Sequence, residues 1–469
     1  MLSVAFVQSH FQSFMETAKM LSQILSIVVD YAWGMPLLIL LVGGGITLVF
    51  YSRFIPLVGF VHAIKLVTGK FHHKDEEKAE GQLSHFKALM NALSSTIGLG
   101  NIAGVAVAIT QGGPGAIFWM WVSALIGMNT KFFESTLAVM YRGHDYRGEV
   151  QGGPMYVIEK ALPKQFHFLA IFFAVCGLIG TMSLFQVNQL ASMSETYFSV
   201  PPIFVGIVSS VFVAYVAMGG VRRIAEITSR LVPLMCVLYI ISAISILVLK
   251  SDLIPRVFLS IFTEALSPSA VGGGVFAGIL IVMKVGIKRA SFSNEAGIGT
   301  ASMAHSNAKT SEPISEGLVA MLGPFIDTIV VCTMTALVIL VTLDPSSYGT
   351  DSGVVLTTRA FESVFGVLGR YFLGISVVLF SLTTMVGMSN YNEKCWNYLF
   401  KGRSFFKENS FIAFYAITIL FGAVSASDDV VNLLDIGFAF MAIPNMMATI
   451  YLAPKVKVEL LKYKAKYLS

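Results

Sequence analysis

Residues 91–127, NALSSTIGLGNIAGVAVAITQGGPGAIFWMWVSALIG, decide the fold class of this chain. An apolar stretch is interrupted at Gly98-Leu99-Gly100-Asn101, and a glycine turn at 112–115 leads directly into a second apolar stretch. Unwound backbone inside a membrane exposes amides and carbonyls, which is tolerated only where these groups line a cavity or meet a ligand. The stretch therefore predicts an interrupted membrane helix that builds a site for a solute.

The composition of the chain indicates an integral membrane protein. Its 469 residues are 55% hydrophobic and 13% charged, about half the charge share of a soluble domain. The mean hydropathy of +0.75 leaves no room for a large soluble domain. The four cysteines stand apart from one another, without the spacing of a metal site, so we expect buried free thiols.

Eleven apolar runs are long enough to cross about 30 Å of hydrocarbon. We expect membrane helices near residues 34–52, 88–110, 115–141, 167–195, 202–219, 227–249, 271–288, 317–342, 370–392, 410–425 and 430–453. Alternate connecting segments hold twenty-six of the 32 Lys and Arg residues. The positive-inside rule then places the N-terminus outside and the C-terminus in the cytoplasm, in a plasma (inner) membrane.

The spans divide into two repeats. After the first helix, ten remain, and five of them lie within 88–250 and five within 271–453. An odd-numbered repeat inserts in opposite orientations, which gives an inverted pair. The other segments are an extracytoplasmic amphipathic segment (1–33), the extra first helix with its cytoplasmic loop (34–87), an outer linker (251–270) and a cytoplasmic tail (454–469).

Glycines interrupt the leading helix of each predicted repeat. They are Gly98, Gly100 and Gly104 in the first, and Gly272, Gly273, Gly274 and Gly278 in the second. Two broken helices at matching positions predict a binding site between them, near the middle of the membrane. The alternative is that the glycines only allow close helix packing.

Several blocks of the sequence carry a resemblance to a known family. They are NALSSTIGLGNIAGV at 91–105, QGGPGAIFWMWVSALIG at 111–127, GGPMY at 152–156, FSNEAGIG at 292–299 and DTIVVCTMT at 327–335. Over about residues 34–455 the chain resembles the alanine or glycine:cation symporter family. The resemblance implies an all-α inverted-repeat fold like that of the amino-acid and neurotransmitter sodium symporters. It also implies sodium-coupled uptake of small neutral amino acids.

The resemblance also implies a site at the first break. The backbone amides of Leu99 and Gly100 would bind the substrate carboxylate, consistent with the positive N-terminal end of a half-helix. A sodium ion would be ligated by the carbonyls of Ser94 and Ile97 and by the hydroxyls of Thr383 and Thr384. The alternative for the two threonines is a hydrogen bond to a carbonyl of their own helix.

The remaining substrate contacts are implied on three other helices. Gln186 matches a family glutamine and would lie between the two ends of the zwitterion, and carbonyls near Gly273, Gly274 and Phe276 would meet the ammonium group. Residues 388–393 read MSNYNE where the family has WSYYGE. Met388 therefore replaces an aromatic side chain and indicates a softer, larger pocket.

Asp327 is an intramembrane carboxylate, and such groups are usually functional. With Thr96 and Asn101 it could hold a second cation. It could instead carry a proton, which would make the chain a proton-coupled carrier of neutral amino acids with a larger pocket. The remaining alternative is a structural role, in which a nearby hydroxyl or an amide of the broken helix is its partner. The spans lack the clustered His, Asp and Glu of an intramembrane enzyme and the repeated filter of a channel. The predicted partners are a neutral amino acid, a sodium ion and the lipid bilayer, without nucleic acid.

Overall fold

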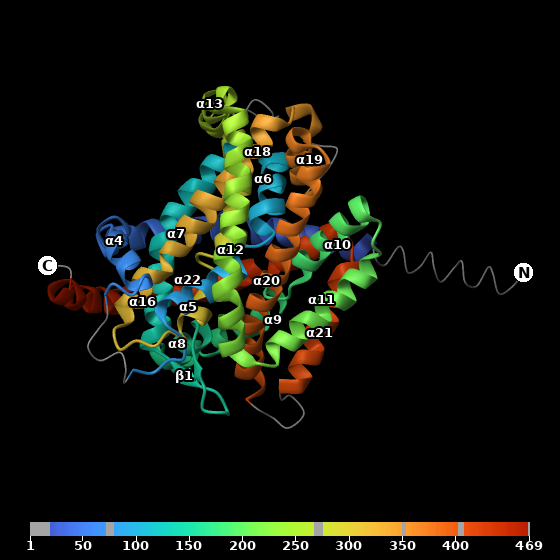
Figure 1. Ribbon diagram of the computed structural model, residues 1–469. Helices are drawn as coiled ribbons and strands as arrows, with labels where there is room; N and C mark the ends of the chain where they lie inside the picture. Colours follow the sequence, from blue (N-terminus) through green and yellow to red (C-terminus); the bar gives the residue numbers. More distant parts are fainter. Residues whose placement is uncertain (1–18, 72–78, 267–274, 349–352, 402–407, 468–469) are drawn as a thin grey trace, which may run out of the picture.

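The computed structural model describes residues 19–71, 79–266, 275–348, 353–401 and 408–467. These residues form helices and one short antiparallel pair of strands, β1 (Gly143–His144) and β2 (Val150–Gln151) (Figure 1). The all-helical class expected from the sequence is confirmed.

The helices of the first half begin after a helical stretch at 19–32. They are α2 (Met35–Leu38), η1 (Ile39–Gly43), α3 (Gly44–Ser52), α4 (Ile55–Val67), α5 (His85–Thr96), η3 (Gly100–Gly104), α6 (Val105–Gly112), α7 (Gly115–Met140), α8 (Pro154–Ala161), η4 (Lys164–Phe166), α9 (Phe168–Gly180), α10 (Leu184–Phe198), α11 (Pro202–Ala217) and α12 (Gly220–Leu249).

The helices of the second half begin with a short turn and end with the longest helix. They are η5 (Ser251–Leu253), α13 (Ile254–Leu266), α14 (Val275–Asn294), α15 (Thr300–His305), α16 (Pro313–Ala320), α17 (Leu322–Pro324), η6 (Phe325–Cys332), α18 (Thr333–Thr342), η7 (Pro345–Ser347), α19 (Val354–Phe365), α20 (Val367–Phe400), α21 (Glu408–Val424) and α22 (Ser427–Tyr467).

Many of these helices suit a membrane. Within the described residues, seven helical segments are long and apolar enough to cross it, and α5 with η3–α6 makes an eighth that is bent by 53°. Large apolar side chains such as Val211 on α11 and Val248 on α12 face outward, 66% exposed each. Lipid is the environment in which such faces are stable. The chain is therefore a multi-pass membrane protein.

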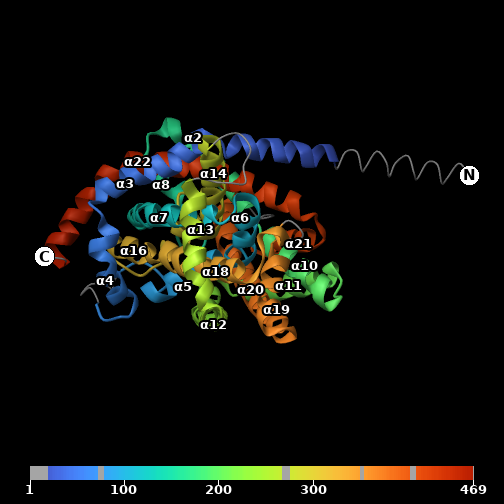
Figure 2. The same cartoon turned by 90° about the horizontal axis from the view of Figure 1, so that it is seen from above.

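The bent pair α5–η3 forms the centre of the molecule. Every residue from 88 to 106 is buried. Helices α12, α15 and α20 pack against α5, and α14 and α18 pack against α6 (Figures 1 and 2). At the periphery, α3 runs beside α22 although the two lie far apart in the sequence (Figure 2). The polar break is thus surrounded by helices and not by lipid.

A second break is described in addition to the one predicted at the glycine run, most of which lies outside the described residues. Gly278 lies inside α14, while Gly272, Gly273 and Gly274 lie outside the described residues. The described interruption runs from Glu295 to Gly299, between α14 and α15. Glu295, Gly297 and Gly299 have φ angles of 57°, 87° and 94°, and glycine adopts such left-handed angles without the steric cost that a Cβ brings. Positive φ angles, and not the density of glycine, therefore mark this break.

Helix α20 approaches α5 closely at Gly387. A Cβ on Gly387 would lie 2.8 Å from the backbone nitrogen of Ser95 and would overlap the hydroxyl of Ser94. Gly104 provides a comparison, because an added Cβ there would have room. Among the described residues, no neighbouring atom lies within 4 Å of the position of that Cβ.

We expect Gly387→Val to destabilise the protein by about 1–3 kcal/mol, because overpacking forces two helices apart. Gly104→Ala should leave stability unchanged or slightly raise it, since alanine favours a helix more than glycine does. Thermal unfolding of both purified variants in detergent measures the difference. Equal melting temperatures for the two variants would contradict the close approach of α5 and α20.

Candidate functional site

The first break is held open by a local hydrogen-bonded loop. Helix α5 ends at Thr96, and Ile97 turns away with φ −78° and ψ 92°. The side chain of Asn101 accepts a hydrogen bond from the Gly98 amide at 2.9 Å, and the Asn101 amide donates to the Gly98 carbonyl at 3.1 Å. Asn101 thus replaces the helical partners that the break removes.

The break leaves several backbone groups without partners. Among the described residues, no acceptor faces the amides of Leu99 and Gly100, which begin the next helical segment. No backbone amide there donates to the carbonyl of Ser94 either. The carbonyls of Ser95 and Thr96 likewise accept from no amide among the described residues. Buried backbone groups are almost always hydrogen-bonded in native proteins, so this set of free donors and acceptors indicates a ligand site.

A carboxylate lies beside this break. The side-chain nitrogen of Asn101, Nδ2, donates to Asp327 Oδ1 at 2.7 Å and to the Asp327 carbonyl at 3.1 Å. Asp327 Oδ2 accepts from the hydroxyls of Ser293 at 2.9 Å and Thr328 at 2.6 Å. Asp327 is fully buried, and within the described residues no Lys, Arg or His lies within 4 Å of it. Its hydrogen-bond donors are two hydroxyls and the side-chain nitrogen of Asn101, so the carboxylate has partners in the protein, and the two hydroxyls are also oxygen ligands of the kind that hard cations bind.

Helix α20 faces the break with one threonine of the predicted pair. The Thr384 hydroxyl donates to the Ile97 carbonyl at 3.3 Å, and a Cβ on Gly98 would overlap that hydroxyl. The Thr383 hydroxyl donates to Leu379 in its own helix at 2.6 Å, which is the alternative stated for it above. The structure therefore brings Ser94, Ile97 and Thr384 together but turns the Thr383 hydroxyl into its own helix.

Thr96 is also bonded within its helix. Its hydroxyl donates to the Ala92 carbonyl at 3.2 Å. The hydroxyls that reach Asp327 come instead from Ser293 and Thr328. Both residues lie in the sequence blocks quoted above. Thr328 is the neighbour of Asp327 in η6, whereas Ser293 reaches the carboxylate only because α14 packs against η6.

An aromatic cover lies over Gly100. The Phe292 ring lies 3.5 Å from the position of a Cβ on Gly100. The rings of Phe185 and Phe438 pack on it, with centroid distances of 5.2 and 5.4 Å. Together they close an apolar wall on the space beside the free amides. Phe292 stands in FSNEAGIG, but no local signal distinguished it as a wall residue.

A buried ion-pair cluster lies next to this cover. Arg289 Nη2 and Lys288 Nζ each lie 2.6 Å from Asp435 Oδ2, and the Arg289 guanidinium lies over the Phe292 ring at 5.5 Å. The Trp33 indole donates to the Asp435 carbonyl at 3.0 Å. The cluster joins α14 to α22 and fixes the cover. It could not be found from the sequence, since Arg289 and Asp435 lie 146 residues apart.

The other predicted substrate residues are only partly described. Gln186 lies in the first turn of α10, 5% exposed, and its carbonyl accepts from Ser381 on α20 at 2.8 Å. Met388 is buried on α20. Gly273 and Gly274 lie outside the described residues, and Phe276 belongs to α14 but its side chain is not described.

On the other side of the breaks, a buried histidine–glutamate cluster joins the half-helix ends. The Glu316 carboxylate contacts His85 Nδ1 and His305 Nδ1 at 2.5 Å each, and all three residues are buried. They come from the start of α5, the end of α15 and the start of α16. Hydrogen bonds to an ionised group are strong, so the cluster ties three segments together.

A guanidinium strengthens the same region. Arg142 donates to the carbonyls of Ser306 at 2.8 Å, Thr310 at 3.3 Å and Glu80 at 3.0 Å, and also to that of Ala308. The segment before α5 therefore lies fixed against the segment after α15.

Comparison with known proteins gives a consistent result. The model of the sodium:alanine symporter family matches residues 18–468. The sodium/alanine symporter AgcS of Methanococcus maripaludis is 40% identical over 439 residues, covering 92% of this chain and 94% of that protein. The probable sodium/glutamine symporter GlnT of Bacillus subtilis is 33% identical over 453 residues, covering 95% and 91%. A manganese transporter of Eremococcus coleocola is 12% identical with a TM-score of 0.49, covering 80% of this chain and 78% of that one.

Proposed function

Because the chain belongs to the sodium:alanine symporter family, we propose that the break between α5 and η3 binds its amino acid and its sodium ion. Membership makes the chain a sodium-coupled amino-acid symporter of the alanine or glycine type and not an enzyme, which confirms the resemblance found in the sequence. The observation that carries the proposal is the set of unpartnered backbone groups at Ser94, Leu99 and Gly100.

The substrate carboxylate binds the amides of Leu99 and Gly100. These amides are the positive end of a helical segment, which favours an anion. The ammonium group faces the end of α14, where the Cα of Ser293 lies 3.6 Å from the position of a Cβ on Gly100. The C-terminal end of a helix favours a cation. The proposal therefore puts the ammonium group at the second described break, whereas the sequence analysis expected it near Gly273, Gly274 and Phe276, which no observation tests.

The pocket suits a small side chain. Phe292 covers the space over Gly100, and Gln186 on α10 supplies a neutral amide that suits a zwitterion. Met388, in place of an aromatic residue, gives a wall that adapts to somewhat larger amino acids. Alanine and glycine are therefore the preferred substrates, and serine is tolerated.

The sodium ion binds between α5 and α20. Its ligands are the carbonyls of Ser94 and Ile97 and the hydroxyl of Thr384, which already lies 3.3 Å from the Ile97 carbonyl. Asp327 with Asn101, Ser293 and Thr328 forms a second cation site next to the carboxylate of the substrate. Oxygen atoms are the ligands that hard cations select.

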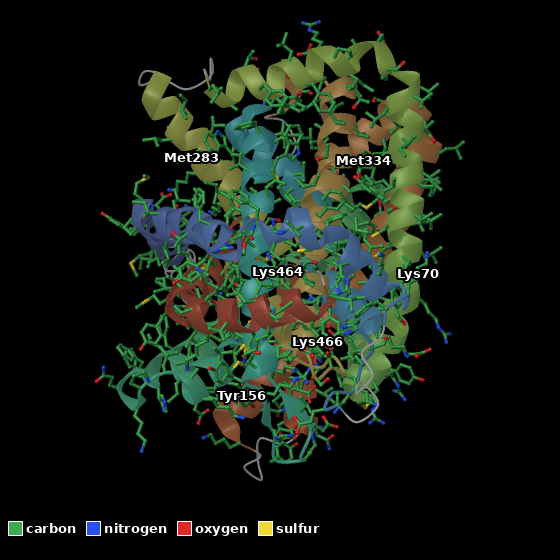
Figure 3. All side chains as sticks on the ribbon, turned by 90° about the vertical axis from the view of Figure 1, so that its left-hand side faces the viewer. Lys70, Tyr156, Met283, Met334, Lys464 and Lys466 are labelled. Atoms are coloured by element: carbon green, nitrogen blue, oxygen red, sulfur yellow. The ribbon has the colours of Figure 1, made fainter. Side chains whose placement is uncertain are left out.

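The chain has eleven spans with its N-terminus outside and its C-terminus in the cytoplasm of a plasma (inner) membrane. Counting α11, α14 and α21 with the eight segments above gives this number. A break follows the first helix of each of two five-helix units, α5 in 88–250 and α14 in 271–453. Breaks at matching positions support an inverted repeat. In Figure 3, Lys70 and Lys464 lie near the middle of the molecule and Lys466 lies nearer to Tyr156, so the orientation rests on the alternation of Lys and Arg along the sequence.

The function is tested by uptake of labelled alanine into proteoliposomes at fixed pH, with a sodium gradient and with a potassium gradient instead. We expect uptake only with sodium, inhibition by unlabelled glycine and serine, and weak inhibition by leucine. Alanine amide should not inhibit, because it lacks the carboxylate. Uptake without sodium, or inhibition by the amide equal to that by alanine, would refute the proposal.

Thr384→Ala should raise the half-saturating sodium concentration several-fold, because the ion loses one of its few ligands at a cost of at least ~1 kcal/mol. Thr383→Ala is the matched control, since its hydroxyl is bonded to Leu379. It should leave the sodium dependence near that of the wild type. The measurement is initial alanine uptake against sodium concentration. An equal rise of the half-saturating sodium concentration in both variants would refute the role of Thr384 as a specific sodium ligand.

Asp327→Asn should reduce sodium-driven uptake at least ~10-fold, because the second cation loses its charged ligand. Under sodium coupling, the residual activity should keep the pH profile of the wild type. The proton-coupled alternative predicts a different result. A pH jump should then drive alanine uptake in sodium-free vesicles, and Asp327→Asn should abolish that uptake. Observing such uptake with the wild-type protein would favour that alternative.

A further inference from the structure

Lys131 is a buried lysine without a fixed partner. It lies on α7 and is 2% exposed. Within the described residues, its ammonium group makes no hydrogen bond and has no carboxylate oxygen within 4 Å. A fully buried lysine is almost always paired, because taking a charge out of water is costly. Ionisable groups inside a membrane are usually functional for the same reason.

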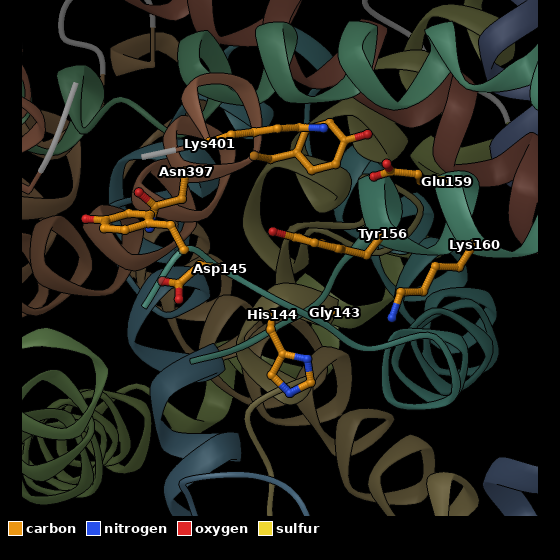
Figure 4. Close-up of a pocket in the computed structure, with 10 residues that line it drawn as sticks. Gly143, His144, Asp145, Tyr156, Glu159, Lys160, Asn397 and Lys401 are labelled. Atoms are coloured by element: carbon orange, nitrogen blue, oxygen red, sulfur yellow. The ribbon is translucent and has the colours of Figure 1, made fainter. Parts of the chain in front are cut away.

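Other lysines of the chain show the usual arrangement. Lys394 is 3% exposed and donates to Ser306 Oγ and Asn307 Oδ1 at 3.1 Å each. Lys160 lines a cavity of about 480 Å³ where the β1–β2 hairpin, α8 and the end of α20 meet (Figure 4), and it donates to the carbonyl of Arg142. Lys131 is buried as deeply as Lys394 but lacks such acceptors.

Three carboxylates lie near the Lys131 ammonium group, at a longer range than an ion pair. They interact with it electrostatically, and they belong to Glu134 on α7, Glu295 at the second break and Asp327 in η6. A Cβ on Gly323 would lie 3.6 Å from Lys131 Nζ, and Gly323 lies one helical turn before Asp327. The ammonium group therefore lies beside the segment that carries Asp327.

The charges of these carboxylates are not cancelled by their hydrogen bonds. Asp327 accepts from neutral donors. Glu134 Oε1 accepts from Asn445 at 2.5 Å, and Glu295 Oε2 accepts from Thr300 at 2.7 Å. Glu134 Oε2 and Glu295 Oε1 are buried without a partner among the described residues. Lys131 is the basic residue whose charge acts on all three groups, so three negative charges share one ammonium group.

The ammonium group can serve these carboxylates in turn. It is a compact charge on a flexible four-carbon stem, and moving it toward one carboxylate breaks no ion pair with another. Asp327 is also the charged ligand of the second cation site proposed above. A cation at that site repels the ammonium group of Lys131 toward Glu134 and Glu295, and the departure of the cation lets the ammonium group approach Asp327.

We propose that Lys131 is the internal counter-ion of the empty carrier. This inference rests on the proposed function, in which a second cation binds at Asp327. After the cation leaves, the Lys131 ammonium group neutralises Asp327, and the protein returns to the conformation open to the outside without an uncompensated buried charge. When sodium binds again, it displaces the ammonium group. Lys131 is thus a positioning residue that acts through Asp327 and does not contact the substrate.

The transport test compares net uptake with exchange in proteoliposomes. Net uptake requires the return of the empty carrier, whereas exchange of labelled for unlabelled alanine at saturating sodium does not. We expect Lys131→Gln to reduce net uptake at least ~10-fold, because the return leaves Asp327 uncompensated, and to keep exchange within about twofold of the wild type. Lys462→Gln is the matched control, since Lys462 pairs with Glu459 near the end of α22. It should change neither mode.

The binding test measures the melting temperature of the full-length protein in detergent against sodium concentration. Without the competing ammonium group, the half-maximal sodium concentration of Lys131→Gln should fall at least ~3-fold below that of the wild type. A lysine with a merely structural role would not tighten sodium binding when removed. Lys131→Arg keeps the positive charge and should keep the wild-type ratio of net uptake to exchange. This variant reports even if Lys131→Gln fails to fold.

The outcomes separate this inference from the proposed function. If wild-type exchange requires sodium and Lys131→Gln keeps the wild-type ratio of net uptake to exchange, the inference alone is overturned. A ratio in Lys131→Arg as low as in Lys131→Gln would also overturn it, since the charge would not be the property that matters. Exchange without sodium by the wild-type protein would overturn the proposed function, and the inference with it.

Discussion

Every backbone amide and carbonyl buried in a membrane protein needs a partner, and this requirement organises the centre of the molecule. Breaking α5 at Ile97 removes the helical partners of several groups. The side-chain oxygen of Asn101 accepts from the Gly98 amide and so replaces one lost partner. The side-chain nitrogen of Asn101 donates to Asp327, which joins this carboxylate to the same network. This network does not reach the groups at Ser94, Leu99 and Gly100, and these are the groups that the proposed function assigns to a substrate and an ion.

The two broken helices are held on both sides of the breaks by contacts of different chemistry. On one side, Phe292 covers Gly100, and the Arg289–Asp435 pair fixes that cover against α22. On the other, Glu316 holds the ends of α5 and α15 through two histidines. Under the proposed function, the site has to be reached from either face of the membrane in turn, and these two sets are the contacts that lie on its two sides. Charged groups suit this role, because water can solvate them when they separate.

The sequence analysis found the first break but gave no sign of the described break at Glu295–Gly299, and one physical reason explains both results. At Gly98-Leu99-Gly100-Asn101 the glycines stand beside a polar side chain that can bond to the freed backbone, so the signal is local. At Gly272–Gly274 and Gly278 there is a high density of glycine, but Gly278 lies in a regular helix. At Glu295–Gly299 the break depends on positive φ angles, which composition does not report.

The sequence by itself determined the membrane class, the family and the position of the first break. Hydrophobic length, the alternation of charge and glycine next to asparagine are properties of short segments, and they need no partner from elsewhere. Tertiary structure decided which polar groups meet. Asn101 and Asp327 are 226 residues apart, Ile97 and Thr384 are 287 apart, and Phe292 covers Gly100 from another helix. Neighbouring threonines such as Thr383 and Thr384 look alike in sequence, and only the packing of α20 against α5 turns one hydroxyl toward the break and the other into its own helix.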